Sequence, residues 1–385
     1  MKSPHVIPYA RQHITADDIE SVVEVLKSDY LTQGPKVVEF ENAFAKYVGT
    51  DFAVAVTNGT AALHLSAMAL NVQPGDRVLS TPNSFVASTN AILYCGGEVE
   101  FVDINPETYL IDEELLEKKL KSRPKGYYRG LVAVDFAGHP LPLEKISHLA
   151  REHGLFFIED ACHAFGARYL PSNSMCGRGD YADLSVFSFH PVKHLATGEG
   201  GMITTNNREL YEKLTTLRTH GITKDPDRLV HKDQGGWYYE MQELGYNYRM
   251  NDIQAALGFS QLSTAIGGLE ERRAIAKRYN QAFKNCPAIV TPIEKEWAKH
   301  SYHLYVPMVE NRLELYNFLK QRNIFAQIHY VPIHWHPYYE KLGHKKGDLP
   351  LAESYYGKCI SLPMFPTLNQ DDQQYVIDTV LAFYQ

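Results

Sequence analysis

Between Phe52 and Glu159, short β-branched runs alternate with longer helical stretches, and this feature most limits how the chain can fold. Parallel strands need a long crossover between them, so such alternation is typical of a mainly parallel sheet flanked by helices. The predicted strands are residues 53–57, 77–80, 99–102, 131–135, 155–158, 184–188 and 201–205. The predicted helices are residues 61–70, 87–94, 112–121 and 143–153. We therefore expect an α/β fold with a seven-stranded sheet.

The pattern changes in the last third of the chain. Residues 250–284 predict one long or kinked helix, interrupted near Gly267 and Gly268, that leaves the larger domain. Beyond it, a strand-like run at 303–309, a helix-like run at 312–322 and a terminal helix from Gln370 predict a smaller α+β domain. We expect a large domain at 12–265 and a small domain at 266–385, with residues 1–11 packing on the small one.

Composition narrows the function further. The chain has 385 residues, of which 44% are hydrophobic and 22% charged, enough for a large core. The net charge of −7 comes without a basic run, so we expect neither a nucleic-acid surface nor a polybasic membrane anchor. There is no leader-like N-terminal run and no apolar stretch long enough to span a bilayer, so we expect a cytoplasmic protein. The five scattered cysteines predict reduced thiols and no metal site.

The segment Ser-Phe-His-Pro-Val-Lys at 188–193 ends a predicted buried strand and precedes Gly-Glu-Gly-Gly at 198–201. A lysine at the mouth of a sheet loses hydration, which lowers its pKa and frees the amine to form a Schiff base with an aldehyde. Lys193 is therefore a candidate to bind pyridoxal phosphate. The alternative is an ordinary solvated surface lysine.

Asp160 follows another predicted strand, in Ile-Glu-Asp-Ala-Cys-His-Ala at 158–164. Ligands of open α/β sheets collect at the carboxyl ends of strands, where a carboxylate can keep a pyridine nitrogen protonated and make the ring an electron sink. Asp160 could instead cap a helix. His163 could hydrogen-bond the ring hydroxyl or lie against the ring, although it could also be structural.

Three further segments offer contacts to such a cofactor. Gly59 and Thr60 lie between a strand and a helix, where backbone N–H groups can hold a phosphate, although a plain Asn-Gly turn capped by Thr60 fits equally well. The Phe85 ring could stack on the cofactor or simply pack, and Ser188 offers a hydroxyl to the phosphate. The dinucleotide-like spacing at 177–182 precedes a strand instead of opening a helix, so we discount it.

Taken together, these residues resemble the DegT/DnrJ/EryC1/StrS sugar aminotransferases, which are fold-type I pyridoxal phosphate enzymes. The resemblance covers nearly the whole chain. Its markers are residues 31–35, 58–63, 85–87, 159–161, 188–193, 199–201 and 245–250. The resemblance implies that Lys193 carries the cofactor and shuttles the proton, while Asp160 pairs with the pyridine nitrogen. The other implied cofactor contacts are Gly59, Thr60, Phe85, His163, Ser188 and, from a neighbouring subunit, Asn247.

Asn247 reaching across to another subunit implies a homodimer. Residues 188–193, 237–244 and 326–333 most resemble the family members of pseudaminic acid biosynthesis. This implies a nucleotide-sugar substrate, UDP-2-acetamido-2,6-dideoxy-β-L-arabino-hexos-4-ulose, that receives an amine at C4 from glutamate. The implied sugar-nucleotide contacts are Tyr9, Tyr30, Leu31, Thr32, Gln33, His329 and Tyr330.

Four alternatives remain open at this point. The substrate could be another nucleotide-linked 3- or 4-keto sugar. Related deoxysugar dehydratases replace the lysine with histidine, and the adjacent His194 makes a one-residue misalignment conceivable. A cofactor-binding regulator without turnover would carry the same motifs. A nicotinamide-dependent dehydrogenase is the most distant alternative, because no dinucleotide fingerprint stands between a strand and a helix.

Overall fold

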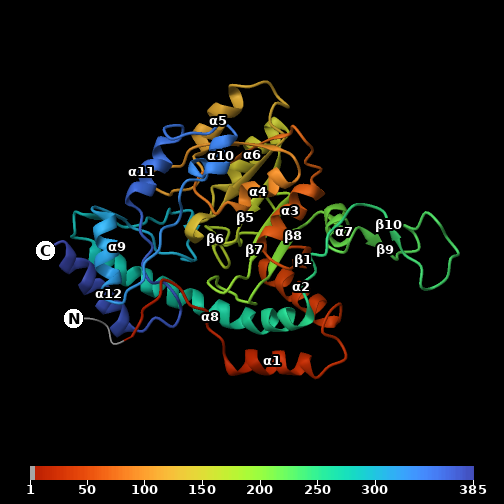
Figure 1. Ribbon diagram of the computed structural model, residues 1–385, viewed down its shortest axis with the longest axis horizontal. Helices are drawn as coiled ribbons and strands as arrows, with labels where there is room; N and C mark the ends of the chain where they lie inside the picture. The colour runs from red at the N-terminus through yellow and green to blue at the C-terminus, as the bar shows by residue number, and fades with distance from the viewer. Residues whose placement is uncertain (1–4) are drawn as a thin grey trace.

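The computed structural model describes residues 5–385 and is built around a seven-stranded sheet of order β1-β8-β7-β5-β4-β2-β3 (Figure 1). The strands are β1 (Phe52–Val56), β2 (Arg77–Ser80), β3 (Glu98–Phe101), β4 (Gly130–Val134), β5 (Phe156–Asp160), β7 (Leu184–Ser188) and β8 (Gly201–Thr205). The strands from β7 to β3 are parallel, whereas β8 is antiparallel to both β1 and β7. The predicted fold class is confirmed, because all seven strands predicted between residues 53 and 205 join this sheet.

Helices connect and cover these strands. They are α1 (Ala16–Leu26), α2 (Pro35–Val48), α3 (Gly59–Ala69), α4 (Ala87–Tyr94), α5 (Glu113–Lys121), α6 (Leu143–His153) and α7 (Arg208–Leu217). Local chemistry fixes their ends. The Asn58 side chain caps α3 by accepting from the Ala61 N–H at 2.8 Å, and Asp112 caps α5 in the same way. Gly154 ends α6 with a left-handed φ of 69°. The predicted helices are thus confirmed.

The long helix α8 (Asp252–Phe283) runs beneath the sheet without a break (Figure 1). The predicted interruption at Gly267 and Gly268 is wrong, because a helical glycine costs only about 1 kcal/mol and packing outweighs that cost. The first half of α8 packs with Phe40 and Phe44, and its second half joins a separate C-terminal apolar cluster. The predicted domain boundary at 265/266 falls inside this helix and stays a prediction.

The C-terminal part contains α9 (Arg312–Lys320), α10 (Pro337–Lys341), α11 (Pro350–Lys358) and α12 (Gln370–Phe383). The predicted helices at 312–322 and from Gln370 are confirmed. The strand predicted over 303–309 is wrong except for β13 (Met308–Val309), which pairs with β11 (Ile289–Val290). Residues 301–304 instead hydrogen-bond the turn at Ala137 and Gly138, with Ser301 N–H to Gly138 O at 3.0 Å and Leu304 N–H to Ala137 O at 3.2 Å.

Residues 5–11 run alongside this C-terminal part. The Ile7 N–H donates to the Asn323 carbonyl at 2.9 Å, and Ile7 is buried in the C-terminal apolar cluster. Residues 1–4 of the predicted N-terminal segment lie outside the described residues. No helix within residues 5–385 combines the length and apolar character needed to cross a bilayer.

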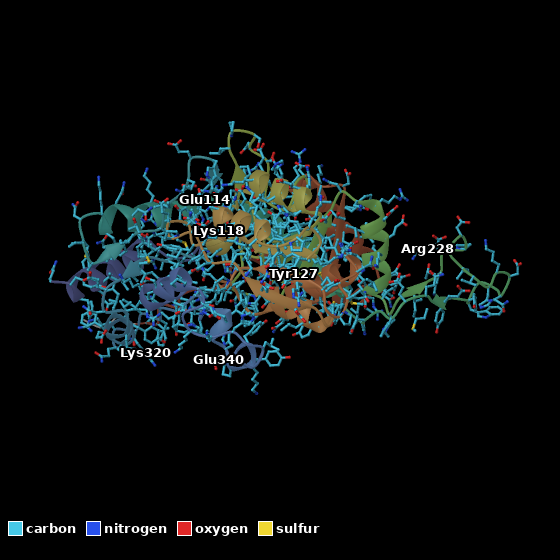
Figure 2. All side chains as sticks on the ribbon, turned by 90° about the horizontal axis from the view of Figure 1, so that it is seen from above. Glu114, Lys118, Tyr127, Arg228, Lys320 and Glu340 are labelled. Atoms are coloured by element: carbon cyan, nitrogen blue, oxygen red, sulfur yellow. The ribbon has the colours of Figure 1, made fainter. Side chains whose placement is uncertain are left out.

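Residues 222–241 form an arm that stands away from the body in both views (Figures 1 and 2). It is a long hairpin in which β9 (Ile222–Thr223) pairs with β10 (Glu240–Met241). Arg228, labelled in Figure 2, ties the arm to α7 through Thr216 Oγ1 at 3.1 Å. Val230 and Trp237 on this arm are 75% and 79% exposed.

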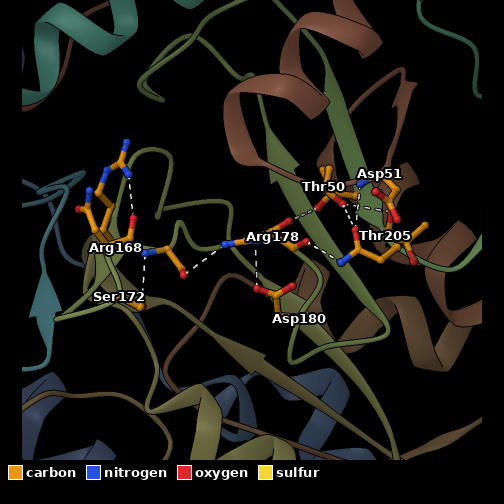
Figure 3. Close-up of polar contacts among 12 residues, drawn as sticks. Thr50, Asp51, Arg168, Ser172, Arg178, Asp180 and Thr205 are labelled. Atoms are coloured by element: carbon orange, nitrogen blue, oxygen red, sulfur yellow. Dashed lines mark hydrogen bonds and ion pairs between the residues drawn. The ribbon is translucent and has the colours of Figure 1, made fainter.

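The loop at 177–182, which carries the discounted dinucleotide-like spacing, forms no helix and leads into β7. Arg178 organises it, with Nε 3.2 Å from Asp180 Oδ2 and its carbonyl accepting from Asn206 Nδ2 at 3.1 Å (Figure 3). Asn206 also accepts from Thr50 Oγ1 at 2.9 Å, so the loop is fastened to the start of β1. These contacts account for the glycine and arginine pattern without a ligand.

Candidate active site

A cavity of about 510 Å³ opens at the carboxyl ends of β1, β5 and β7. Ligands of open α/β sheets bind at this edge, because the loops that follow the strands converge there. Many of the predicted site residues meet in this cavity. They are Tyr9, Gly59, Thr60, Phe85, Asp160, His163, Ser188, Lys193, His329 and Tyr330.

Two parts of the prediction do not line this cavity. Asn247 is exposed, and its backbone forms a bridge with Thr219. Residues 30–33 lie at the start of α8 instead, where the Leu31 carbonyl accepts from the Asp252 N–H at 3.0 Å. Tyr30 and Leu31 are exposed there. The roles assigned to Asn247, Tyr30, Leu31, Thr32 and Gln33 stay predictions.

Other residues, to which the sequence assigned no site role, also line the cavity, although several of them lie within the marker segments. They are Asn58, Leu63, Ser84, Ala87, Ser88, Val134, Cys162, His190, Val192, Glu199 and His303. Most are sequence neighbours of predicted residues and could have been found by extending each motif. Ser88 lies in the first turn of α4, three residues after Phe85, so its position at the start of a predicted helix was a usable signal. No such signal existed for His303, because this residue lies in a segment that was predicted to be an ordinary strand.

The N-terminus of α3 forms a concave cup beside the end of β7. Gly59 and Thr60 are the first residues of that helix, where backbone N–H groups have no intrahelical acceptor and attract anions. A Cβ atom on Gly59 would lie 3.0 Å from Ser188 Cβ and 3.3 Å from Ser188 Oγ. The absence of a side chain at Gly59 therefore leaves the Ser188 hydroxyl and the helix N–H groups open to one ligand. A phosphate group fits this arrangement.

Asp160 is held in a fixed orientation at the end of β5, with only 4% of its surface exposed. Ser88 Oγ donates to its Oδ2 at 2.6 Å, and the Cys162 N–H donates to its Oδ1 at 3.2 Å. Hydrogen bonds to both oxygens fix the orientation of this carboxylate in the cavity wall. From this position it can pair with a protonated ring nitrogen.

Lys193 contributes the primary amine of the cavity. Desolvation lowers the pKa of this amine below its usual range, while Cys162 and Asp160 act in the opposite direction. Within residues 5–385 the Nζ atom makes no hydrogen bond and no ion pair, whereas the backbone N–H is fixed on the His190 carbonyl at 2.8 Å. An amine that is partly desolvated and unpaired is a competent nucleophile for an aldehyde.

His163 is neutral and its tautomer follows from its partners. Burial, reinforced by the Lys193 charge, lowers the pKa of His163 well below its usual range. The Ala137 N–H donates to Nδ1 at 3.2 Å, so the proton sits on Nε2, which faces the Tyr330 hydroxyl at 3.2 Å. Both ring nitrogens are thus engaged by protein, which leaves the face of the ring for a ligand.

Comparison with known proteins agrees with this geometry. Residues 12–381 match the DegT/DnrJ/EryC1/StrS aminotransferase family. The chain is 42% identical over 383 residues to an uncharacterized protein of Methanocaldococcus jannaschii, covering 98% of this chain and 96% of that one. It is 38% identical over 387 residues to a UDP-4-amino-4,6-dideoxy-N-acetyl-beta-L-altrosamine transaminase of Campylobacter jejuni, covering 99% and 98%.

Two solved structures share the fold over nearly their whole length. Helicobacter pylori PseC, an aminotransferase of pseudoaminic acid biosynthesis, superposes with a TM-score of 0.89 at 33% identity, covering 98% of this chain and 99% of that one. The pyridoxal phosphate form of a putative sugar aminotransferase from Streptococcus pneumoniae superposes with a TM-score of 0.89 at 28% identity, covering 98% of both chains. The chain therefore belongs to the DegT/DnrJ/EryC1/StrS aminotransferase family, and it is a sugar aminotransferase that uses pyridoxal phosphate.

Proposed function

We propose that this protein transfers the amino group of glutamate to C4 of UDP-2-acetamido-2,6-dideoxy-β-L-arabino-hexos-4-ulose, in pseudaminic acid biosynthesis. The observation that carries this proposal is the unpaired Lys193 amine in one cavity with the fixed Asp160 carboxylate and the cup at Gly59. The choice of sugar follows the Campylobacter jejuni transaminase and Helicobacter pylori PseC, which match over nearly the whole chain.

In this proposal the predicted cofactor contacts in the cavity have defined tasks. Bound pyridoxal phosphate supplies an electron-poor ring that stabilises negative charge on the carbon losing a proton. Lys193 Nζ holds the cofactor between turnovers, then takes that proton and returns it to the neighbouring carbon. Asp160 keeps the ring nitrogen protonated. Gly59, Thr60 and Ser188 hold the phosphate, and the Phe85 side chain, 59% exposed at the cavity wall, stacks on the ring.

The proposed sugar contacts in the cavity come from the C-terminal part and from the N-terminal segment that runs alongside it. His329 Nδ1 lies 2.7 Å from Ser361 Oγ, and its ring lies 5.5 Å from the Tyr9 ring, between centroids. Desolvation lowers the pKa of His329 to about 3, so it is neutral. Tyr9, His329 and Tyr330 thus offer neutral polar groups and flat apolar faces, which suit a deoxysugar better than they suit a dicarboxylate.

We propose a homodimer in which each subunit completes the other's cavity. The support is the position of residues that the family resemblance assigns to the site but that lie outside their own cavity, namely Asn247 and residues 30–33. The arm at 222–241, with its exposed Trp237, is long enough to reach a second subunit and apolar enough to be buried against it.

The experiment that tests the function is mass spectrometry of products from a panel of UDP- and dTDP-linked 4-keto-6-deoxyhexoses, with glutamate as donor. Conversion of the UDP-linked N-acetylated sugar supports the proposal. Conversion of dTDP sugars alone contradicts the pathway and leaves the family assignment intact. If glutamate fails to convert the bound cofactor to its amine form, the protein is a regulator or a dehydratase instead.

A further inference from the structure

His303 lines the cofactor cavity with no assigned task. The residue is only 3% exposed, yet neither of its ring nitrogens hydrogen-bonds any residue within 5–385. An imidazole nitrogen that has no protein partner but reaches a cavity is free to hydrogen-bond a ligand there. The neighbouring cavity histidines differ in this respect, because His163 and His329 both have protein partners.

Hydrogen bonds and close packing fix the backbone of His303. Arg272, itself 1% exposed, donates from Nη1 to the carbonyls of Tyr302 and His303, at 3.2 Å each. A Cβ atom on Gly138 would lie 3.1 Å from the backbone nitrogen of His303, so the turn at Ala137 and Gly138 packs directly against this segment. The imidazole is therefore presented to the cavity from a rigid support, as a recognition group must be.

The ring is also kept neutral. Burial lowers the pKa of His303 well below its usual range, and the charges of Lys193 and Arg272 act in the same direction. The His163 ring lies 4.4 Å away and the His194 ring 5.6 Å away, between centroids, and both are neutral for the same reasons. A neutral imidazole beside a lysine suits a neutral oxygen, such as a hydroxyl or a carbonyl, and it does not suit a carboxylate.

The two nitrogens are not equivalent. The Nδ1 atom is fully buried in protein, so Nε2 is the ring nitrogen that can face the cavity. From this geometry we infer that His303 is a further ligand-contacting residue, whose Nε2 hydrogen-bonds a neutral oxygen next to the Lys193 amine. Two ligands can supply that oxygen, the keto sugar or the cofactor ring. The inference rests on the proposed function, since it presumes that both occupy this cavity.

Substitutions that imitate one nitrogen at a time test this inference in the holoenzyme. His303→Gln places an amide near the position of Nε2, His303→Asn places one near Nδ1, and His303→Leu removes both. We expect kcat/KM for the keto sugar to fall about tenfold or more in His303→Leu and His303→Asn, and to recover substantially in His303→Gln. His139→Gln is the matched control, because His139 is equally buried but lines a different cavity and has partners at both nitrogens.

Two readouts identify the source of the oxygen. If the sugar supplies it, the half-reaction with glutamate keeps its wild-type rate while the half-reaction with the sugar slows. If the cofactor supplies it, the absorbance spectrum of the bound cofactor shifts and its dissociation constant rises in His303→Leu. Either result supports the inference. The inference would be overturned if His303→Leu kept the wild-type rate with the sugar and the wild-type cofactor spectrum and affinity, or if His303→Asn and His303→Gln recovered the same activity. Failure of the wild-type protein to aminate any keto sugar would instead overturn the proposed function.

Discussion

Ser88 Oγ donates a 2.6 Å hydrogen bond to Asp160 Oδ2, joining the first turn of α4 to the end of β5. A hydrogen bond to a charged group contributes about 1.5 to 3 kcal/mol. We therefore expect Ser88→Ala to lower kcat/KM roughly ten- to hundredfold, because the carboxylate loses both orientation and charge stabilisation. Steady-state kinetics measure this. Ser66→Ala is the control, since Ser66 is also buried but bonds only the Ala62 carbonyl of its own helix, and equal losses in both variants would contradict the role of Ser88.

Replacing Lys193 should abolish covalent retention of the cofactor. Wild-type protein treated with borohydride and then denatured should keep pyridoxal phosphate on the peptide containing Lys193, and Lys193→Ala should keep none. We also expect Lys193→Ala to lose at least about a thousandfold in kcat, because the proton-shuttling amine is gone. Lys118 is an exposed residue of α5 (labelled in Figure 2), and Lys118→Ala should behave as wild type. Cofactor found on another lysine would refute the assignment.

A methyl group at Gly59 should weaken cofactor binding. The new Cβ atom would lie 3.0 Å from Ser188 Cβ and would narrow the cup at the start of α3. We expect the dissociation constant of pyridoxal phosphate in Gly59→Ala to rise about tenfold, which corresponds to about 1.4 kcal/mol. In Gly267→Ala the added atom meets open space on α8, so this control should bind cofactor normally and gain up to about 1 kcal/mol in stability. Fluorescence titration measures both.

The buried carboxyl pair behind the site should make stability depend on pH. Burial raises the pKa of Asp135 well above its usual range, and Glu159 adds to the effect. The folded protein therefore holds this proton more tightly than the unfolded chain does, so stability falls as the pH rises from the ordinary aspartate pKa toward the folded value. Asp135→Asn removes the titrating group and keeps an oxygen for the Leu141 N–H.

We accordingly expect Asp135→Asn to match or exceed the wild-type free energy of unfolding above neutral pH, by about 1 kcal/mol, with a flatter pH dependence. Urea denaturation at several pH values measures this. Asp135→Ala should instead lose stability at every pH, because the Leu141 N–H is left unpaired. An unchanged pH slope in Asp135→Asn would mean that Asp135 is ionised in the folded protein.

Charges placed on the arm and on the residues that directly follow it should disrupt the proposed homodimer. Trp237 and Leu244 are 79% and 74% exposed in one chain, so burial against a partner would make Trp237→Glu and Leu244→Glu costly. We expect the double variant to sediment as a monomer and to bind pyridoxal phosphate more weakly, because Asn247 follows the same arm. Leu313 on α9 is 64% exposed in the chain, and Leu313→Glu should leave the sedimentation coefficient unchanged.

The sequence supported local assignments better than distant ones. Each strand could be predicted from its own β-branched run. Asp160 and Ser188 could then be assigned to the site because they stand at the carboxyl ends of predicted strands. The break predicted in α8 failed because a glycine pair is a local signal, whereas the continuity of that helix comes from tertiary packing along its length. The place of His303 was missed for the same reason, since its segment bonds a turn far away in the sequence.

The loop at 30–33 illustrates a different limit. Its contacts with Asp252 depend on where α8 begins, and the sequence of the loop itself does not predict that position. Sequence resemblance can assign such a segment to a site, but in a single chain these residues remain outside the cavity. If the proposed homodimer brings them to the cavity of the second chain, a variant that sediments as a monomer should also bind the cofactor more weakly.

The walls of the cavity come from stretches that begin at Tyr9 and end at Tyr330, so no short fragment of the chain contains a usable site. Vitamin B6 can therefore recognise only a polypeptide that has finished folding. Since a ligand that binds only the native state shifts the folding equilibrium toward it, cells starved of this vitamin should degrade the protein faster than replete cells do. The abundance of the enzyme, and not merely its turnover, would then follow the nutritional state of the cell.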